Sequence, residues 1–411
     1  MTVASCPDWF RRRRYLHFDI PLGWEAALRV VNREVELGSH SYYPLISSSL
    51  RSRKYKKDER KTVIKERPIG YAAHADSQIM SYYSSVVAAP YEGALAKSDV
   101  SRCVIAYRKL GKSNIAMACD VFGEVADRRD CDVICLDVSK FFESIAHDRL
   151  ISAVKLVMAQ SRLPSGLYRC LRAVTKYCDV DRSELLKVLE LPESRLAGLQ
   201  RLCTPRQFRE IVRPSGVLKV NQTGIGIPQG TPISSLLSNI YLLDFDREVT
   251  RIVKGLGGIY RRYSDDILVV CPPGHGEDLS HQVSDLIVGQ GLEINAGKTE
   301  LSEFRSGRLG HGRELQYLGL TFDGDSVRVR PSSLSRYYQK AKSALRKVAY
   351  GAAVKGRGVN AKGVRMRYTH HGRRNFIRYA LEVSELSGSP GARGQVKRHK
   401  AKLNSYLNDA I

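Results

Sequence analysis

A short apolar run at residues 133–136, which ends in Asp137, constrains the fold of this chain most. Four consecutive apolar residues between acids are typical of a strand that is buried on both faces of a sheet. A carboxylate that directly follows such a strand is expected at a cleft, because burying an unpaired charge in a core is costly. The run therefore predicts a central strand with Asp137 at the edge of a cleft.

Two further apolar segments, residues 259–263 and 267–270, flank Ser264-Asp265-Asp266 and predict a hairpin with two acids at its tip. Apolar residues at helical spacing predict a helix opened by Pro232 and another ended by Gly291. With a last strand at residues 300–304, the order is β-α-β-β-α-β. This order is the split β-α-β unit of ferredoxin-like domains.

The rest of the chain predicts a mainly helical surrounding. Residues 1–50 are expected to be mostly helical, residues 51–70 to form an exposed basic hairpin, and residues 73–98 to be helical. A short strand is expected at residues 102–107, and residues 145–222 are expected to be largely helical. The expected fold class is therefore α+β, with more than one domain.

Asp137, Asp265 and Asp266 are the candidate catalytic residues and metal ligands. In the expected fold the first strand and the hairpin lie side by side, so the three carboxylates form one cluster. Clustered carboxylates repel one another and favour divalent cations, here two Mg²⁺ ions with Mn²⁺ as an alternative. Two such ions clamp the attacking and leaving oxygens of a phosphoryl or nucleotidyl transfer. Acids are also common in turns that have no catalytic role, and this alternative stays open.

The charge of the chain indicates its partner. Lys and Arg number 66 against 42 Asp and Glu, which gives a net charge of +24. Residues 331–411 hold 18 of these basic residues and only three acids. Such a surface collects polyanions, so nucleic acid is the expected partner, and a merely solvated basic face is the alternative.

The sequence predicts a cytoplasmic protein that does not enter a membrane. No stretch approaches the ~18 consecutive apolar residues of a membrane-spanning helix. Residues 11–14, all arginine, stand without the apolar region of a signal peptide. The nine cysteines include no C-x-x-C pair, which favours reduced thiols over disulfides or a zinc site.

Six motifs in order resemble those of reverse transcriptases. Residues 136–145 (LDVSKFFESI) resemble the first palm motif, and residues 263–266 (YSDD) resemble the catalytic box. The others are residues 227–235 (IPQGTPISS), similar to the motif beneath the incoming nucleotide, residues 291–295 with Lys298, similar to the fourth motif, residues 317–320 (YLGL), similar to the primer grip, and residues 65–69 (KERPI), similar to a finger motif. The resemblance covers about residues 50–325 and implies a right-hand polymerase with fingers, a ferredoxin-like palm and a helical thumb.

The resemblance also implies a role for individual residues. It implies metal ligands at Asp137, Asp265, Asp266 and the Val138 carbonyl. The other implied roles concern the nucleotide and the primer: a proton donor to pyrophosphate at Lys298, a ring at Phe142 that blocks a ribose 2′-OH, nucleotide contacts at Gln229 and Gly230, triphosphate contacts at Lys65 and Arg67, and primer-grip contacts at Tyr317 and Gly319. A core role for Phe142 and an ordinary exposed lysine at Lys298 stay open as alternatives.

The implied domains are an N-terminal helical extension at residues 1–50, fingers at 51–130, a palm at 131–325 and a basic helical thumb at 326–411. A helical fingers insertion is expected within the palm at about residues 145–222. In the thumb, Arg336, Lys340 and Lys347 fall near one side of an expected helix whose other side is apolar. We expect these three side chains to bind nucleic-acid phosphates.

The motifs are bacterial in character and resemble group II intron and retron enzymes. Residues 105–113 and 328–338 resemble the defence-associated "unknown group" reverse transcriptases. This branch implies DNA synthesis from deoxynucleotides on an RNA template, with a structured non-coding RNA, in protection against phage. Template-independent or protein-primed DNA synthesis, RNA synthesis, and an RNA-binding scaffold with a vestigial palm are the alternatives, and oligomerisation stays open. The Phe142 ring argues against RNA synthesis.

Overall fold

The central sheet positions the acidic residues. The computed structural model describes residues 5–56, 61–358, 361–368 and 375–408. Within this part, β3 (Cys131–Ser139) lies between β9 (Glu300–Arg305) and β7 (Asp266–Cys271), and β10 (Arg308–Gly312) and β6 (Ile259–Tyr263) form the outer strands. All four neighbouring pairs are antiparallel, and the short β8 (Glu293–Ile294) pairs with the end of β3.

The connections of this sheet confirm the expected split β-α-β unit. From β3 the chain passes through α9 (Ser234–Tyr241) and α10 (Leu243–Gly255) to the β6–β7 hairpin, and then through α11 (Gly276–Gly289) to β9. The strand order β9-β3-β7-β6 is that of a ferredoxin-like sheet. The first helix begins two residues after Pro232, at Ser234, so the proline precedes the helix instead of opening it.

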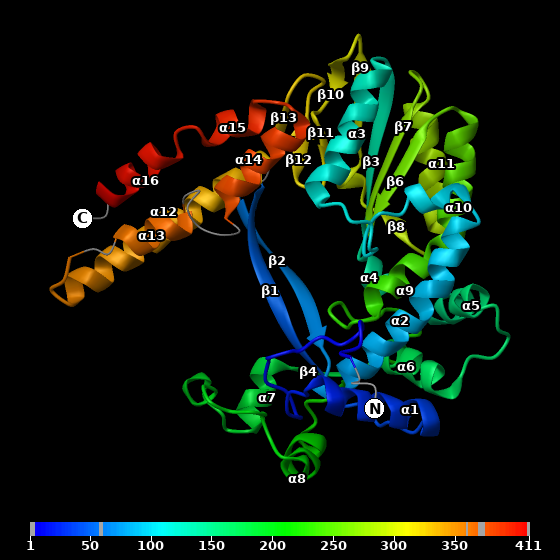
Figure 1. Cartoon of the computed structure of the whole chain (residues 1–411), viewed down its shortest axis with the longest axis vertical. Helices are drawn as coiled ribbons and strands as arrows, with labels where there is room; N and C mark the ends of the chain where they lie inside the picture. The colour runs from blue at the N-terminus through cyan, green and yellow to red at the C-terminus, as the bar shows by residue number, and fades with distance from the viewer. Residues whose placement is uncertain (1–4, 57–60, 359–360, 369–374, 409–411) are drawn as a thin grey trace.

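Both faces of the central sheet are buried, as the continuous apolar run predicts. Ile134 and Leu136 point into a core shared with α10, α11 and α2 (His74–Ala96). Val133 points to the opposite core, which contains α3 (Asn114–Arg128) and the small sheet of β11 (Leu315–Tyr317), β12 (Leu320–Phe322) and β13 (Val327–Val329). Figure 1 shows α3 and the small sheet on one side of β3 and α10 and α11 on the other.

The N-terminal part corrects two expectations. Residues 1–50 were expected to be mostly helical, but among the described residues of this range only α1 (Trp24–Leu37) is a helix, and residues 5–23 are irregular. Residues 45–50 belong to the long antiparallel hairpin of β1 (Leu45–Lys56) and β2 (Lys61–Tyr71). Residues 46–50 pair with β2, and residues 45–47 also pair with β4 (Cys178–Asp181), a remote segment that a local pattern does not reveal. The strand expected at residues 102–107 is wrong, because η1 (Asp99–Arg102) is followed by a single bridge between Val104 and Arg262.

The segment at residues 145–222 is mainly helical, as expected, but it also contributes β4 and β5 (Lys219–Val220) to the sheet of β1 and β2. The strand order of this sheet is β2-β1-β4-β5, so the segment pairs directly with the N-terminal hairpin. The helices around it are α4 (Phe141–Ser144), α5 (His147–Val157), α6 (Ser165–Thr175), α7 (Arg182–Val188), η2 (Glu193–Arg195), α8 (Pro205–Gln207), η3 (Phe208–Val212) and η4 (Arg213–Ser215).

The C-terminal part is helical, as expected. It consists of α12 (Pro331–Val354), α13 (Ala361–Tyr368), α14 (Phe376–Ser387), α15 (Gly391–Val396) and α16 (His399–Asn408). Figure 1 shows α12, α13 and α16 as an arm that extends away from the central sheet, with α14 and α15 against the small sheet at its base. Ala341 and Leu345 of α12 pack against Leu403 of α16 and hold the arm together.

Two further expectations concern the whole chain. All nine cysteines lie in the described residues and are free thiols, as expected. Among the helices of the described ranges, none has the length and apolar character needed to cross a bilayer.

Candidate active site

Asp137 and Asp266 are directly paired residues on the neighbouring antiparallel strands β3 and β7. Beside this pair, the Val138 amide donates to the Asp265 carbonyl oxygen at 3.0 Å, so the hairpin tip is bonded to the end of β3. The structure thus brings together all three carboxylates that the sequence singles out. The position follows from the ladder itself, because paired residues on antiparallel strands lie only about 4.5–5.5 Å apart.

The hairpin tip is a two-residue turn of Ser264 and Asp265 between the paired Tyr263 and Asp266. Ser264 has a φ of +61°, which is uncommon for a residue with a side chain and costs about 1 kcal/mol or more. Its hydroxyl oxygen accepts a hydrogen bond from the Tyr107 hydroxyl at 3.2 Å. The loop at residues 105–113 therefore holds the acidic turn from outside the sheet.

A buried arginine, which the sequence analysis missed, holds the same turn from below. Arg262 donates to the Ser264 carbonyl oxygen at 3.0 Å and forms an ion pair with Asp246 of α10 at 2.7 Å. Both charged side chains are fully buried, and the Tyr260 hydroxyl also donates to Asp246 at 2.6 Å. The two-residue period of β6, which places Arg262 on the face of Tyr260, is the sequence signal that could have found it.

Burial and the neighbouring carboxylates act on Asp266. The pKa of Asp266 is raised to about 6, first by the loss of hydration at its carboxyl group and then by repulsion from Asp265 and Asp137. The Asp266 residue as a whole is exposed, so its carboxyl group loses only part of its hydration. Two cations offset the repulsion: the Lys298 ammonium forms an ion pair with Asp137, and Arg330, also missed in the sequence, acts on Asp266 at longer range.

These residues fit a divalent cation by the chemistry of their donors. In the described part of the chain, no group of three or more His, Cys, Asp or Glu side chains is arranged as a complete metal-ligand set. The Lys298 ammonium instead contacts Asp137, where a cation is electrostatically favoured. Carboxylate oxygens that repel one another at a strand end are suitable ligands for Mg²⁺ once this ammonium is displaced. Val138 lies next to Asp137 in β3 with a buried side chain, so only its backbone is available to a ligand.

The Pro-Gln-Gly loop packs on the end of β2. The Gly70 amide donates to the Gln229 carbonyl oxygen at 2.9 Å. Gly230 has a φ of +109°, and a Cβ there would lie 2.7 Å from the Gly70 carbonyl oxygen, so only glycine fits this approach. Arg67 lies on β2 three residues before Gly70 and is exposed. The side chain of Lys65 lies outside the described residues.

Phe142 connects this loop to the acidic strand. It lies on α4, directly after β3, and its carbonyl oxygen accepts a hydrogen bond from the Ile227 amide at 2.8 Å. The side chain packs in the main core, with 9% of its surface exposed. Phe142 therefore links the end of β3, which carries Asp137, to the Pro-Gln-Gly loop through Ile227. Most of its ring is buried in the core.

The residues expected to contact nucleic acid lie on elements other than those that carry the carboxylate cluster. Tyr317 is buried in the core that contains α3 and the small sheet, and the turn of Leu318 and Gly319 follows it; the primer-grip role of these residues stays a prediction. Both turn residues have positive φ, which is the geometry of a tight hairpin. Arg336, Lys340 and Lys347 are exposed on α12, in the C-terminal arm.

No curated protein sequence matched the chain. Among solved structures, the chain is similar to a C-terminally truncated apo telomerase from Candida tropicalis (TM-score 0.45, 11% identity, 73% of this chain and 59% of that one). It is also similar to Candida albicans telomerase in complex with a telomeric RNA fragment (0.47, 10%, 93% and 59%) and to the RNA-dependent RNA polymerase of a human picobirnavirus (0.45, 11%, 90% and 57%).

The chain spans less than two thirds of the length of these structures. One protein-family model matches more than half of this chain. The model described as reverse transcriptase (RNA-dependent DNA polymerase) matches residues 98–322, which include β3, the Pro-Gln-Gly loop and the β6–β7 hairpin. This chain belongs to the reverse transcriptase family.

Proposed function

We propose that this protein is an RNA-directed DNA polymerase that adds deoxynucleotides to a primer on an RNA template. The observation that carries the proposal is the direct pairing of Asp137 with Asp266 beside the Asp265 turn, within the segment that matches the family. Nucleotidyl transfer needs charge stabilisation and positioning more than covalent chemistry from the protein. Clustered acids, together with a basic C-terminal arm elsewhere in the chain, would meet both needs.

Asp137, Asp265, Asp266 and the Val138 carbonyl would hold two Mg²⁺ ions, or Mn²⁺. Bound ions of this kind supply positive charge to the attacking and leaving oxygens. Lys298 then leaves Asp137 and becomes available to protonate the leaving pyrophosphate. Its place beside Asp137 supports this role better than an ordinary surface position does.

The nucleotide would bind over the junction of β2 and the Pro-Gln-Gly loop. Arg67 is exposed on β2 and can neutralise a triphosphate, and Lys65 is assigned the same role by its place in the motif. Gln229 and Gly230 would contact the nucleotide from the loop, which the absence of a Cβ at Gly230 allows to pack closely on Gly70 of β2. Phe142, at the base of this loop, would meet a ribose 2′-OH and so favour deoxynucleotides.

The domains of this enzyme would follow the expected division. Fingers at residues 51–130 would contain β2 and the second half of β1, which begins at Leu45. The palm at residues 131–325 would contain the central sheet, and the thumb at residues 326–411 would contain the helical arm. The insertion at residues 145–222 belongs with the fingers, because β4 and β5 extend the sheet of β1 and β2.

The biological setting that we propose is bacterial anti-phage defence in the cytoplasm, with a structured non-coding RNA. It rests on the resemblance of residues 105–113 and 328–338 to the defence-associated group. In the fold, Tyr107 of the first segment touches the acidic turn, and Arg330 of the second acts on Asp266. Plating phage on cells that carry the wild type or the Asp265→Ala/Asp266→Ala variant tests this setting. The wild type should protect the cells and the variant should not. Protection by the variant would contradict a defence that depends on DNA synthesis, and no protection by the wild type would contradict the defence role itself.

A primer-extension assay tests the activity itself. The Asp265→Ala/Asp266→Ala variant should lose DNA synthesis on a primed RNA template and keep its fold and its RNA binding. Asp278→Ala/Asp285→Ala, which removes two exposed acids from α11, is the matched control and should retain synthesis. Equal synthesis with and without template would favour the template-independent alternative. Synthesis that survives the loss of both acids would end the proposal.

A further inference from the structure

The four arginines at residues 11–14 divide into two pairs with different surroundings. Arg11 donates to the carbonyl oxygen of Asp8 at 2.9 Å, and its backbone amide donates to Gln78 at 3.5 Å. Arg13 donates to the Ser81 hydroxyl at 3.2 Å. Both Gln78 and Ser81 belong to α2, so alternate arginines attach this segment to that helix.

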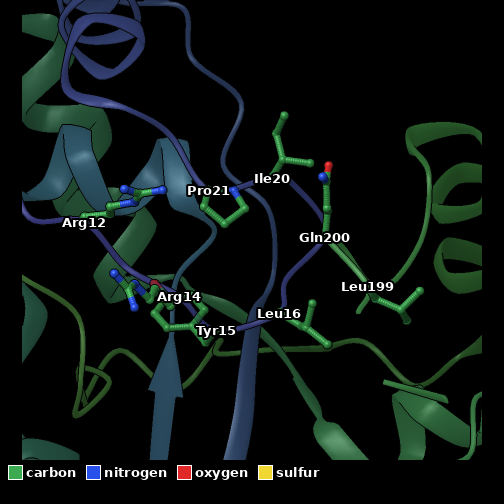
Figure 2. A pocket seen from close by; sticks show the side chains of 8 residues that line it. All are labelled: Arg12, Arg14, Tyr15, Leu16, Ile20, Pro21, Leu199 and Gln200. Atoms are coloured by element: carbon green, nitrogen blue, oxygen red, sulfur yellow. The ribbon is translucent and has the colours of Figure 1, made fainter. Parts of the chain in front are cut away.

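Arg12 and Arg14 point the other way. Both are exposed, and among the described residues neither guanidinium has a hydrogen-bond or ion-pair partner. They line a pocket of about 310 Å³ with six further residues: Tyr15, Leu16, Ile20, Pro21, Leu199 and Gln200. Figure 2 shows the two arginines on one side of the pocket and Ile20, Leu199 and Gln200 on the other.

The lining of this pocket indicates its ligand. None of its residues is acidic, so both guanidinium groups lack local neutralisation. Guanidinium groups bind phosphate oxygens through paired hydrogen bonds. Ile20 and Leu199 are large apolar side chains with 45% and 39% of their surface exposed, and Pro21 lies between Ile20 and the arginines. Two cations opposite an apolar wall suit a nucleotide unit, with its phosphates on the arginines and its base on the wall.

The pocket is joined to the proposed nucleotide site through the end of β2. The Tyr15 hydroxyl donates to the Ala72 carbonyl oxygen at 2.7 Å, and its ring contacts Tyr71 at a centroid distance of 4.8 Å. Tyr71 directly follows Gly70, whose amide is bonded to Gln229. A nucleic-acid strand bound at the pocket would thus lie next to the end of β2, the strand that supports the Pro-Gln-Gly loop.

We propose that the Arg12–Arg14 pocket binds single-stranded RNA outside the carboxylate site, as an anchor for the unpaired part of the template. The identity of this strand as template rests on the proposed function, whereas binding of single-stranded RNA by the pocket does not. The pocket takes the backbone of any sequence, because phosphate contacts carry no base information.

The test compares fluorescently labelled RNA templates annealed to one DNA primer, with 5′ overhangs of about 3 and about 15 unpaired nucleotides. In wild type, the long overhang should bind more tightly. Arg12→Gln/Arg14→Gln should remove most of this difference, with a loss of roughly five- to tenfold for the long overhang. Since each single-strand phosphate contact contributes a slope of roughly 0.7 to the salt dependence, the slope should flatten by about 1.4.

Arg247→Gln/Arg251→Gln is the matched control, because it removes two exposed arginines that are already ion-paired with Asp244 at 2.8 Å and Glu248 at 2.5 Å. This control should keep the overhang preference. An unchanged preference in Arg12→Gln/Arg14→Gln would overturn the proposal. If the variant lost only the binding of dATP or inorganic phosphate, the pocket would be a small-anion site and the proposal would fail. If the control lost the overhang preference equally, the effect would come from net charge alone, which would also overturn the proposal.

The same titrations separate this inference from the proposed function. The Asp265→Ala/Asp266→Ala variant should keep the overhang preference although it makes no DNA. A wild-type protein that makes no DNA but shows an arginine-dependent overhang preference would retain the pocket and end the polymerase proposal.

Discussion

Arg262 of β6 and Asp246 of α10 form a fully buried ion pair beneath the turn that presents Asp265. The carboxylate accepts two hydrogen bonds from this guanidinium, both at 2.7 Å, and a third from the Tyr260 hydroxyl. The remaining donors of Arg262 reach Ser264 and Asn239, so the turn, the strand and the preceding helices share one network. Through the Ser264 carbonyl oxygen, this network contacts the backbone of the acidic turn.

Arg262→Met should destabilise the protein by about 3–5 kcal/mol, because it leaves the Asp246 carboxylate buried without its partner. Arg261→Met is the neighbouring control; its side chain is partly exposed and pairs with Glu124, so its cost should stay near 1 kcal/mol. Urea unfolding measures both. The double variant Arg262→Met/Asp246→Leu should recover much of the stability but not the synthesis, if the pair positions the turn. Full synthesis in the double variant would contradict that role.

The raised pKa of Asp266 predicts a pH-dependent stability. Its pKa is about 6 in the folded protein against an ordinary value of 3.8, so the folded state binds this proton more tightly. Without divalent metal, stability should therefore fall as the pH rises from about 4 to about 6. Asp266→Asn should remove this fall and stabilise the metal-free protein at pH 7 by on the order of 1 kcal/mol, after allowance for solvent screening.

Thermal unfolding in EDTA between pH 4.5 and 7.5 measures this effect, with Asp285→Asn as the control on α11. Added Mg²⁺ should raise the melting temperature of wild type more than that of Asp266→Asn, since the variant has one carboxylate fewer. A variant that is less stable than wild type at pH 7 without metal would show that the three acids do not repel one another in the folded state.

The sequence was sufficient for the central sheet because its signals are local. The apolar run before Asp137 and the acids between two short strands specify neighbouring strands, and the antiparallel ladder then brings Asp137 to Asp266. Pairing with a remote partner leaves no such local signal. This is why residues 45–50 were expected to be helical, although residues 45–47 pair with β4, more than a hundred residues later.

Side-chain burial limited the prediction of the site. The motif at residues 317–320 forms a tight turn in which Leu318 and Gly319 both have positive φ, and its sequence alone does not show that Tyr317 is buried. Arg262 was missed for the opposite reason. An arginine in a strand is expected on the solvent face, and only its partner Asp246 on a separate helix makes burial tolerable.

Gly230→Ala should weaken nucleotide binding. A methyl group would lie 2.7 Å from the Gly70 carbonyl oxygen and 2.9 Å from Ile69, so the Gln229 loop must move away from β2. Gly216→Ala is the control, because Gly216 also has a positive φ but has open space around it. We expect at least a tenfold higher KM for deoxynucleotides in Gly230→Ala alone. Similar KM values in the two variants would attribute the effect to backbone strain.

Phe142→Val should relax the choice of sugar if the ring meets the 2′-OH. The measurement is the ratio of kcat/KM for a deoxynucleotide to that for the matching ribonucleotide, which should fall about tenfold or more. The buried part of the ring also contributes to the core, so the variant should lose roughly 1–3 kcal/mol of stability in either case. Lower stability with an unchanged ratio would assign Phe142 to the core alone.

The exposed basic face of α12 should bind duplex phosphates. Arg336, Lys340 and Lys347 are exposed, whereas Tyr338, Ala341 and Leu345 of the same helix are buried, so the helix has a solvent side and a packed side. Contacts from the solvent side would position a template–primer without reading its sequence. Exchange of all three residues for Gln should therefore weaken binding to a similar extent for unrelated sequences.

The salt dependence decides between binding and mere solvation of this face. Each lost contact to a duplex phosphate should flatten the plot of log affinity against log salt by about 0.9, hence by nearly three for the triple variant. The control exchanges Arg206, Arg247 and Arg251, which are each paired with an acid three or four residues away. Filter binding on a blunt template–primer excludes any contribution from an overhang. An equal slope for the triple variant and wild type would show that α12 does not contact the duplex and that its charge is only solvated.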